Sequence, residues 1–336
     1  MIAARTLANN EIKSIICRLR IAEGKMKIVF MGSPEISVPF LDFCVGKADE
    51  IIVFSQKDKI RGRGKKLEPT PVKKRALELG LEVHTLWSKS EKAFEIMKNF
   101  APDLLFVVAY GQILPKRILD IPKLYPLNVH FSLLPKYRGS TPVNTALLNG
   151  DTVSGTSVMV MDEELDSGDV VLSAECAVEE SDNATTLFEK LTALSLELLE
   201  NNWEKIGNGT LERVPQQGEP VFTNMIQKSD MWLDFESDAR ILFNKIRALT
   251  YEPGVRAIFR GNIVGIEKAE FAGNCSGKAG EITEVSKSGI VVACRNGGIK
   301  IIELKPAGKK SMKAAEFING YKPAQGEIFS SNNENS

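Results

Sequence analysis

The sequence is poor in the residues that metal and disulfide sites need. It holds only two histidines, His84 and His130, and its five cysteines lie far apart without a Cys-x-x-Cys pair. This pattern argues against a disulfide framework and against a zinc site, and it favours free thiols in a reducing compartment. We therefore expect a protein without a bound metal.

Three further absences narrow the class of protein. No apolar run approaches the roughly 18 residues that a membrane-spanning helix needs. The 43 basic and 43 acidic residues balance, so any affinity for nucleic acid must come from local patches. The Met-Gly-Ser-Pro stretch at Met31 is not a Gly-x-Gly-x-x-Gly fingerprint, which leaves a nicotinamide oxidoreductase without support.

From Met26 the chain alternates short β-branched runs with helical patterns, which predicts an α/β domain with a largely parallel sheet. Pro34 follows Ser33 and is predicted to be the first residue of a helix that Ser33 caps. The predicted helices are 34–46, 71–80, 89–99 and 183–206, and the predicted strands are 27–30, 51–54, 81–86, 103–110, 127–132 and 156–161.

The second half of the chain has a different pattern. Residues 207–224 are rich in glycine, proline and polar side chains, which is typical of a linker. A helix is predicted over 237–250, and the short strands that follow, separated by turns such as Arg-Gly-Asn at 260–262, predict a small β-barrel. The predicted segments are an N-terminal extension 1–25 (an added helix, an upstream start or a targeting peptide), an α/β domain 26–206, a linker 207–229, a barrel domain 230–326 and a disordered tail 327–336.

One strand carries residues suited to catalysis. Because residues two apart in a strand share a face, Asn128 and His130 project together near the carboxyl end of a parallel strand, where such sheets bind ligands. An amide donor beside an imidazole can stabilise a developing oxyanion and handle a proton. Asp162, Asp166 and Asp169 are candidate partners for the imidazole. The same spacing also fits a buried structural histidine, so spacing alone leaves both interpretations open.

Two motifs resemble a known family. The stretch Asn-Val-His-Phe-Ser-Leu-Leu-Pro-Lys-Tyr-Arg-Gly at 128–139, followed by Glu-Leu-Asp-Ser-Gly-Asp at 164–169, resembles the signature of the 10-formyltetrahydrofolate-dependent formyltransferases. The resemblance extends from Met26 to about residue 325. It implies a Rossmann-like, mostly parallel catalytic domain, a linker and a small OB-like barrel, in agreement with the domains predicted above. It also makes catalysis the favoured interpretation of His130.

The resemblance implies roles for individual residues. An amine attacks the formyl carbon of 10-formyltetrahydrofolate, the co-substrate, and no metal is required. Asn128 and His130 match the pair that stabilises the negatively charged oxygen and assists proton movement. Asp166 matches the carboxylate that orients the histidine and helps to remove the amine proton through water. The implied folate contacts are Ser132, Leu133, Leu134 and Pro135, together with Ala109, Tyr110, Gly111 and Ile113.

A basic segment indicates the recipient of the formyl group. Residues 57–66 include six basic residues and one acidic residue, and they resemble the loop with which tRNA-acting members of the family read an acceptor stem. The resemblance implies methionyl initiator tRNA as recipient and tetrahydrofolate as product, with a monomeric enzyme. We expect it in the bacterial cytoplasm, with an organelle as the other setting. The predicted tRNA contacts are Arg61, Arg63, Lys65 and Lys66, with Lys309 and Lys310 on the barrel.

Other functions compete with this one. A UDP-aminoarabinose formyltransferase shares the catalytic trio and a second domain but does not need the basic loop, so this loop is the discriminating feature. Glycinamide ribonucleotide formyltransferases end before a second domain. A catalytically silent RNA-binding protein would not need Asn128, His130 and Asp166 together.

Overall fold

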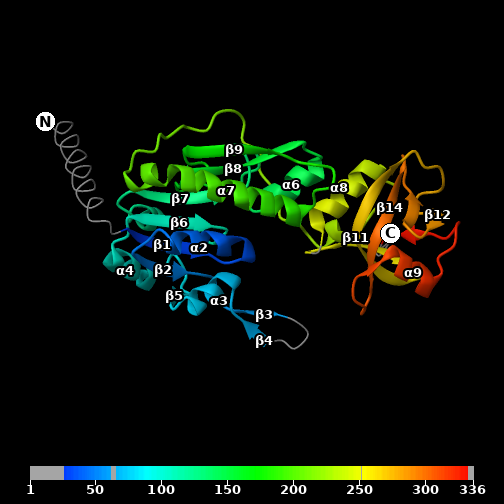
Figure 1. Ribbon diagram of the computed structural model, residues 1–336, viewed down its shortest axis with the longest axis horizontal. Coiled ribbons are helices and arrows are strands. Elements are labelled where there is room, and N and C mark those ends of the chain that lie inside the picture. The colour runs from blue at the N-terminus through cyan, green and yellow to red at the C-terminus, as the bar shows by residue number, and fades with distance from the viewer. Residues whose placement is uncertain (1–25, 62–65, 251, 332–336) are drawn as a thin grey trace. The chain divides into compact units, whose positions relative to one another are not determined.

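The computed structural model describes residues 26–61, 66–250 and 252–331, with only the backbone at residues 60, 61 and 66. The chain forms two compact units (Figure 1). The first comprises residues up to Ser140 together with Gly155–Cys176 and Phe188–Phe222. The second comprises Thr141–Ser154, Ala177–Leu187 and the residues from Thr223 onwards. The chain therefore passes between the units more than once.

The first unit is built on a seven-stranded sheet with the order β5-β2-β1-β6-β7-β8-β9. The pairs from β5 to β7 are parallel, and β8 runs antiparallel to β7. This confirms the predicted mostly parallel sheet. The strands are β1 (Lys27–Gly32), β2 (Glu50–Phe54), β5 (Glu82–His84), β6 (Leu104–Val108), β7 (Tyr125–His130), β8 (Val153–Val160) and β9 (Val170–Ala177).

Helices cover both faces of this sheet (Figure 1). One face packs against α4 (Glu91–Phe100) and α5 (Lys116–Leu119), whose Ala93, Met97 and Ile118 join a buried apolar cluster with β1, β2 and β6. On the other face, Phe131 contacts Phe40 of α2 (Val38–Val45) and Phe188 of α7 (Ala184–Gly207). The 3-10 helix η1 (Glu35–Ser37) and α3 (Pro71–Glu78) complete this layer.

Local predictions in the first unit were partly wrong. Ser33 does not cap a helix: its hydroxyl donates to the carbonyl of Tyr110 and accepts from the backbone of Gln56, so it joins two loops at the sheet edge. Strand β9 was missed because its residues alternate between partial burial and exposure without a continuous apolar run. The two-stranded ribbon β3 (Lys59–Arg61) and β4 (Lys66–Glu68) was also missed.

The second unit contains a curled antiparallel sheet with the order β12-β13-β14-β11-β10-β16, and β15 pairs with β14. The two ends of this order meet: the backbone of Ile282 donates to Glu327, and that of Phe329 donates to Gly280. These bonds curl the sheet as a barrel requires, in agreement with the prediction. The strands are β10 (Val255–Phe259), β11 (Asn262–Gly273), β12 (Ile282–Ser286), β13 (Gly289–Ala293), β14 (Gly298–Pro306), β15 (Met312–Lys313) and β16 (Phe329–Ser330).

Helices complete the second unit. The amide of Asn144 in α6 (Pro142–Asn149) donates to the carbonyl of Ala248 in α8 (Ala239–Leu249) at 2.7 Å, which joins the two helices. Helix α9 (Ala314–Tyr321) places Phe317 against Phe259 of the sheet, and η2 (Ser229–Met231) is a short 3-10 turn. Helix α8 matches the helix predicted over 237–250, whereas α6 and α9 were not predicted.

Two general predictions can be compared with the described residues. Cys44, Cys176, Cys275 and Cys294 form no disulfide in the described part of the chain, as predicted, and Cys17 lies outside that part. Among the helices that the structure describes, none combines the length and apolarity needed to cross a bilayer.

Candidate active site

The carboxyl ends of β6 and β7 lie side by side. The two strands are parallel neighbours, and Val107 pairs in register with Asn128. The segments that follow them, 109–113 and 131–135, therefore leave the same edge of the sheet. This is the position at which open parallel sheets bind ligands. The fold thus brings together two segments that the sequence implied as folate contacts.

Asn128 and His130 share one face of β7, as the period-two spacing predicted. Both are buried, with 8% and 6% of their surfaces exposed. Among the described residues, none forms a hydrogen bond with the Asn128 side-chain amide. A nearly buried amide without a protein partner can donate to a bound molecule at little cost, because no internal bond has to break.

The turn after β7 determines which ring nitrogen of His130 carries the proton. The imidazole Nε2 lies 2.9 Å from the carbonyl oxygen of Tyr137. Because a carbonyl only accepts, this contact assigns the proton of the neutral ring to Nε2 and leaves a lone pair on Nδ1. Tyr137 reaches this position with a left-handed backbone, φ 64°. A tyrosine in this region carries about 1–2 kcal/mol of strain, which the surrounding contacts must offset.

The remaining imidazole nitrogen faces Asp166. Nδ1 of His130 and Oδ2 of Asp166 are 3.8 Å apart, longer than a direct hydrogen bond. Catalytic bonds of this kind often shorten when substrate binds. Oδ2 also accepts from the backbone of Gly139 at 2.7 Å, and Asp166 has φ 50°. Of the three acidic candidates, Asp166 is the one beside His130, whereas Asp162 accepts from Ser167 within its own loop at 2.6 Å.

The loop that carries Asp166 approaches β8 closely at Gly168. A Cβ atom built on Gly168 would lie 1.8 Å from the carbonyl oxygen of Val160, which is backbone and cannot turn aside. The next residue, Asp169, accepts the backbone hydrogen bond of Val160 at 2.9 Å. The glycine of the Leu-Asp-Ser-Gly motif therefore sets how near the Asp166 loop can lie to the sheet.

We expect Gly168→Ala to lower the free energy of unfolding by roughly 1–3 kcal/mol, since an added methyl group must push two backbone segments apart. The activity should fall as well, because Asp166 moves with the loop. Gly46→Ala is the matched control: its Cβ would meet backbone oxygens no closer than 3.5 Å. Urea unfolding of both variants measures the effect, and equal stability of the two would contradict the close-approach argument.

The folate turn predicted from the sequence follows β7 directly. The hydroxyl of Ser132 donates to the carbonyl of Lys136 at 2.5 Å, and the backbone of Leu134 donates to the hydroxyl of Ser157. Leu133 occupies the space that Gly155 leaves open on β8. The Leu134–Pro135 peptide bond is cis. These contacts hold the turn with its backbone fixed next to His130.

The other predicted folate segment, 109–113, is held by Gln56 and is largely exposed. The Gln56 amide donates to the carbonyls of Tyr110 and Gly111 at 2.9 and 3.3 Å. Ala109, Gly111 and Ile113 are exposed, and Ile113 has 67% of its surface accessible. The ring of Tyr110 instead joins the buried core cluster, where burial raises the pKa of its hydroxyl. The ring of Tyr110 is therefore a part of the core and does not face a ligand.

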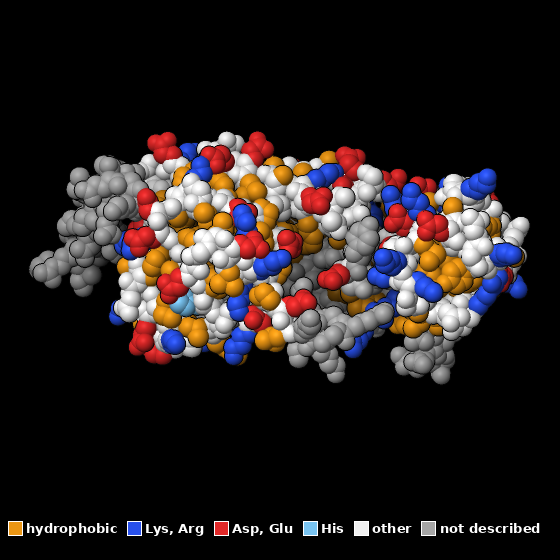
Figure 2. Space-filling model, turned by 60° about the horizontal axis from the view of Figure 1, so that its bottom comes forward, with side chains coloured by type: hydrophobic (Ala, Val, Ile, Leu, Met, Phe, Trp, Pro, Cys, Tyr) orange, Lys and Arg blue, Asp and Glu red, His pale blue; other side chains and the backbone are white. Residues whose placement is uncertain are grey.

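The predicted tRNA contacts fall in two places. Arg63 and Lys65 lie outside the described residues, and only the backbone of Arg61 and Lys66 is described, as a register pair of the β3–β4 ribbon. Lys309 and Lys310 are exposed on the turn after β14. Their neighbour Lys305 approaches Glu267 within 3.5 Å. Lysine and arginine side chains, interspersed with acidic ones, recur over the face of the second unit in Figure 2.

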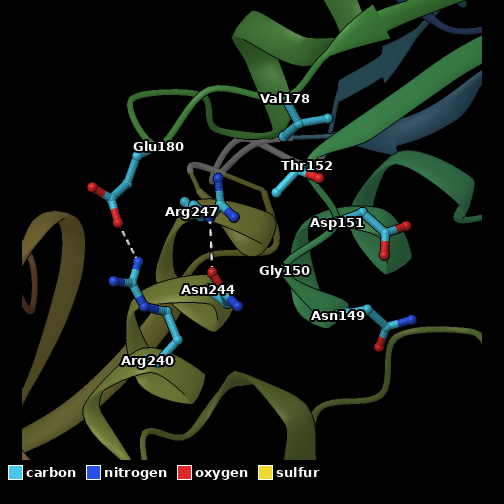
Figure 3. A pocket seen from close by; sticks show the side chains of 9 residues that line it. All are labelled: Asn149, Gly150, Asp151, Thr152, Val178, Glu180, Arg240, Asn244 and Arg247. Atoms are coloured by element: carbon cyan, nitrogen blue, oxygen red, sulfur yellow. Dashed lines mark hydrogen bonds and ion pairs between the residues drawn. The ribbon is translucent and has the colours of Figure 1, made fainter.

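A cavity of about 310 Å³ lies in the second unit, and none of the predicted site residues lines it (Figure 3). Arg240 pairs with Glu180 and holds the pKa of that carboxyl below its ordinary value. Burial lowers the pKa of Arg247, whose guanidinium donates to Asn244. The cavity is lined by Asn149, Gly150, Asp151, Thr152, Val178, Glu180, Arg240, Asn244 and Arg247.

Two groups that support the catalytic trio, Gln216 and the carbonyl of Tyr137, were not predicted from the sequence. Gln216 was predicted to lie in a linker, yet its side-chain amide bonds to the backbone of Asp166. The carbonyl of Tyr137 was not expected to orient His130. No sequence signal marks either contact, because both depend on how loops fold over one another. In the described part of the chain, no group of three His, Cys, Asp or Glu side chains is placed to hold a metal ion.

The chain belongs to the formyl transferase family. The family model for formyl transferase matches residues 26–201, which contain the Asn128, His130 and Asp166 cluster. The model for the formyl transferase C-terminal domain matches residues 225–322, which contain every strand of the curled sheet except β16. The resemblance to this family, which the two motifs indicated, is therefore confirmed over residues 26–201 and 225–322.

The similar curated proteins carry a more particular name. Methionyl-tRNA formyltransferase of Macrococcus caseolyticus is 40% identical over 298 residues, which cover 88% of this chain and 96% of its own length. Methionyl-tRNA formyltransferase of Pelotomaculum thermopropionicum is 37% identical over 308 residues, or 90% of this chain and 98% of its own.

Solved structures share the fold at lower identity. HypX from Aquifex aeolicus, solved in complex with tetrahydrofolic acid, is 17% identical with a TM-score of 0.63, and the match covers 90% of this chain and 48% of HypX. An N-formyltransferase from Helicobacter canadensis, solved with folinic acid and dTDP-3-aminofucose, is 22% identical with a TM-score of 0.64. The match covers 82% of this chain and 98% of the N-formyltransferase. At these identities the likeness establishes the fold alone.

Proposed function

We propose that this chain transfers the formyl group of 10-formyltetrahydrofolate to the α-amino group of methionine carried by initiator tRNA, for the start of translation. The observation that carries the proposal is the identity of up to 40% with methionyl-tRNA formyltransferases across nearly their whole length. The assembled trio supplies the chemistry. The products are formylmethionyl-tRNA and tetrahydrofolate, and we propose a monomeric enzyme in the cytoplasm of a bacterium.

The trio suits acyl transfer without a covalent enzyme intermediate. As the amine nitrogen bonds to the formyl carbon, the carbonyl oxygen gains negative charge, and the free amide of Asn128 donates to it. His130 takes the proton from the amine at Nδ1, beside the Asp166 carboxylate that stabilises the resulting imidazolium. His130 then returns a proton to the folate nitrogen as its bond to the formyl carbon breaks. Asn128 thus stabilises the negative charge on the oxygen, and His130 transfers the proton with the support of Asp166.

The two segments at the sheet edge fit a folate. The exposed backbone of Ala109 and Gly111 and the exposed side chain of Ile113 combine polar groups with an apolar surface. We propose that they line the pterin site with the Ser132–Pro135 turn, whose internal hydrogen bonds keep it preformed. A preformed site avoids the cost of ordering loops when the co-substrate binds.

The recipient can be tested directly. Purified protein is incubated with 10-formyltetrahydrofolate and either methionyl initiator tRNA or UDP-aminoarabinose, the competing amine. We expect formylation of the tRNA-borne methionine and none of the sugar. Formylation of the sugar with no reaction of the tRNA would overturn the proposal. The solved sugar N-formyltransferases resemble this chain in fold, which does not by itself favour a sugar substrate.

We expect Arg63→Ala to lower kcat/KM for methionyl initiator tRNA by about tenfold, which corresponds to loss of one good base or phosphate contact. The salt dependence of tRNA binding should also become shallower if a phosphate contact is lost. Lys92→Ala, which removes an equal charge from an exposed position on α4, is the control and should leave the kinetics unchanged. Unchanged kinetics with both initiator and elongator tRNAs would refute the assigned role of Arg63.

A further inference from the structure

The segment from Leu211 to Phe222 crosses the Asp166 loop and the turn that follows β7. Val214 and Val170 exchange two backbone hydrogen bonds of 2.9 Å at the start of β9. Further along, the backbone of Arg138 donates to Val221 at 2.8 Å, in the turn that follows His130. The segment was predicted to be part of a linker, but these bonds attach it to both sides of the site. We call it the crossing segment.

Gln216 lies in the middle of the crossing segment and uses its whole side-chain amide. Its Nε2 donates to the carbonyl of Asp166 and to that of Gly168, each at 2.8 Å. Its Oε1 accepts from Nη2 and Nε of Arg138, at 2.7 and 3.1 Å. One amide therefore connects the acidic loop to the turn after β7.

The connected backbones hold the reacting groups. Asp166 lies on one side of the bridge, and its carboxylate accepts from Gly139, the neighbour of Arg138. On the other side, Arg138 follows Tyr137, whose carbonyl fixes the His130 ring. Asp166 and Tyr137 both have left-handed backbones, which relax unless their surroundings hold them. Gln216 thus joins the loop that carries Asp166 to the turn that orients the His130 ring.

We propose that Gln216 is a positioning residue for formyl transfer, which holds the Asp166 loop at its working distance from His130 through its two carbonyl contacts. The proposal rests on the proposed function for its kinetic part. Gln216 does not reach the substrates in this role and acts through Asp166. Replacing Gln216 should therefore slow the chemical step and leave substrate binding unchanged.

The sharpest variant is Gln216→Glu. It keeps the shape of the side chain and an acceptor for Arg138, but it replaces the donating NH2 group by an oxygen that faces two carbonyl oxygens. We expect kcat to fall by at least about tenfold while KM for 10-formyltetrahydrofolate and for methionyl-tRNA stays within about twofold. Gln217→Glu introduces the same charge at the exposed neighbouring position and should leave kcat unchanged.

The two histidines provide a readout that needs no substrate. Imidazole NMR signals of His130 and His84 can be assigned in the same spectrum, and His84 lies on β5, against Phe54. We expect Gln216→Glu to shift the His130 signals and leave those of His84 in place. This comparison still tests the positioning role if the wild-type protein fails to formylate tRNA, which would refute the proposed function alone.

Gln216→Ala removes the same two donors without adding charge, and it serves if Gln216→Glu does not fold. It should lower kcat and shift the His130 signals in the same way. The proposal is overturned if a folded Gln216 variant keeps kcat within twofold of wild type, or if its His130 signals coincide with those of wild type.

Discussion

Replacing His130 by glutamine lowers kcat for formyl transfer by about 10²–10⁴-fold, the usual contribution of a positioned acid–base group. The glutamine amide can still donate to the carbonyl of Tyr137, which the imidazole Nε2 contacts at 2.9 Å, so the turn keeps its acceptor satisfied. The amide cannot take up a proton beside Asp166. The loss should therefore appear in single-turnover kinetics, while equilibrium binding of methionyl-tRNA is retained.

His84→Gln is the control for this prediction. His84 packs against Phe54 with 4.9 Å between ring centroids, on a strand at the far edge of the sheet. The same substitution there should leave kcat unchanged. Retention of kcat within tenfold by His130→Gln would contradict the proposed acid–base role, and loss of tRNA binding by the same variant would show that the residue supports the structure and not the chemistry.

The sequence was sufficient where the structure depends on local periodicity. Asn128 and His130 lie on one face at the end of β7 because side chains alternate along any strand. The neighbouring apolar strand, predicted over 103–110, pairs in parallel with β7 as expected for strands that alternate with helices. Both facts follow from patterns within a few residues. The edge of the sheet that holds the site could therefore be predicted before any contact was known.

The sequence was not sufficient where loops from distant parts of the chain meet. Asp166 lies beside His130 because its backbone is left-handed and because Gly168 allows its loop to approach Val160. Neither feature has a periodic signal, and the resemblance to a family, not the spacing, selected Asp166 from three acidic candidates. The same limit explains Gln216. Its partners lie 48, 50 and 78 residues earlier in the chain, and Gln216 itself lies in a stretch whose composition is typical of a linker.

Composition also obscured two elements of the first unit. Strand β9 is at the edge of the sheet, so its side chains need not be apolar on both faces, and its pattern did not resemble that of the buried strands. The β3–β4 ribbon contains the basic residues Lys59, Arg61 and Lys66, and its sequence has the composition of a solvated charged loop. In both cases the backbone forms the expected strand hydrogen bonds without the hydrophobic run by which strands are recognised.

Replacing Asn128 by alanine should separate catalysis from stability. In the described part of the chain no hydrogen bond reaches the Asn128 side chain, so its removal leaves no protein group without a partner. We expect the free energy of unfolding to change by about 1 kcal/mol or less. The catalytic rate should fall by about 10²–10³-fold, which is the usual effect of removing one donor to a developing oxyanion.

Asn144→Ala is the matched control, because it removes an asparagine whose amide has a purely structural partner. That amide donates to the carbonyl of Ala248 at 2.7 Å, so its loss should destabilise the protein by roughly 1–3 kcal/mol and leave kcat unchanged. Urea unfolding and kcat measured on both variants should thus give opposite results. If Asn128→Ala behaves like Asn144→Ala, with lower stability and an intact rate, the Asn128 side chain contributes to packing only. Another hydrogen-bond donor must then stabilise the oxyanion.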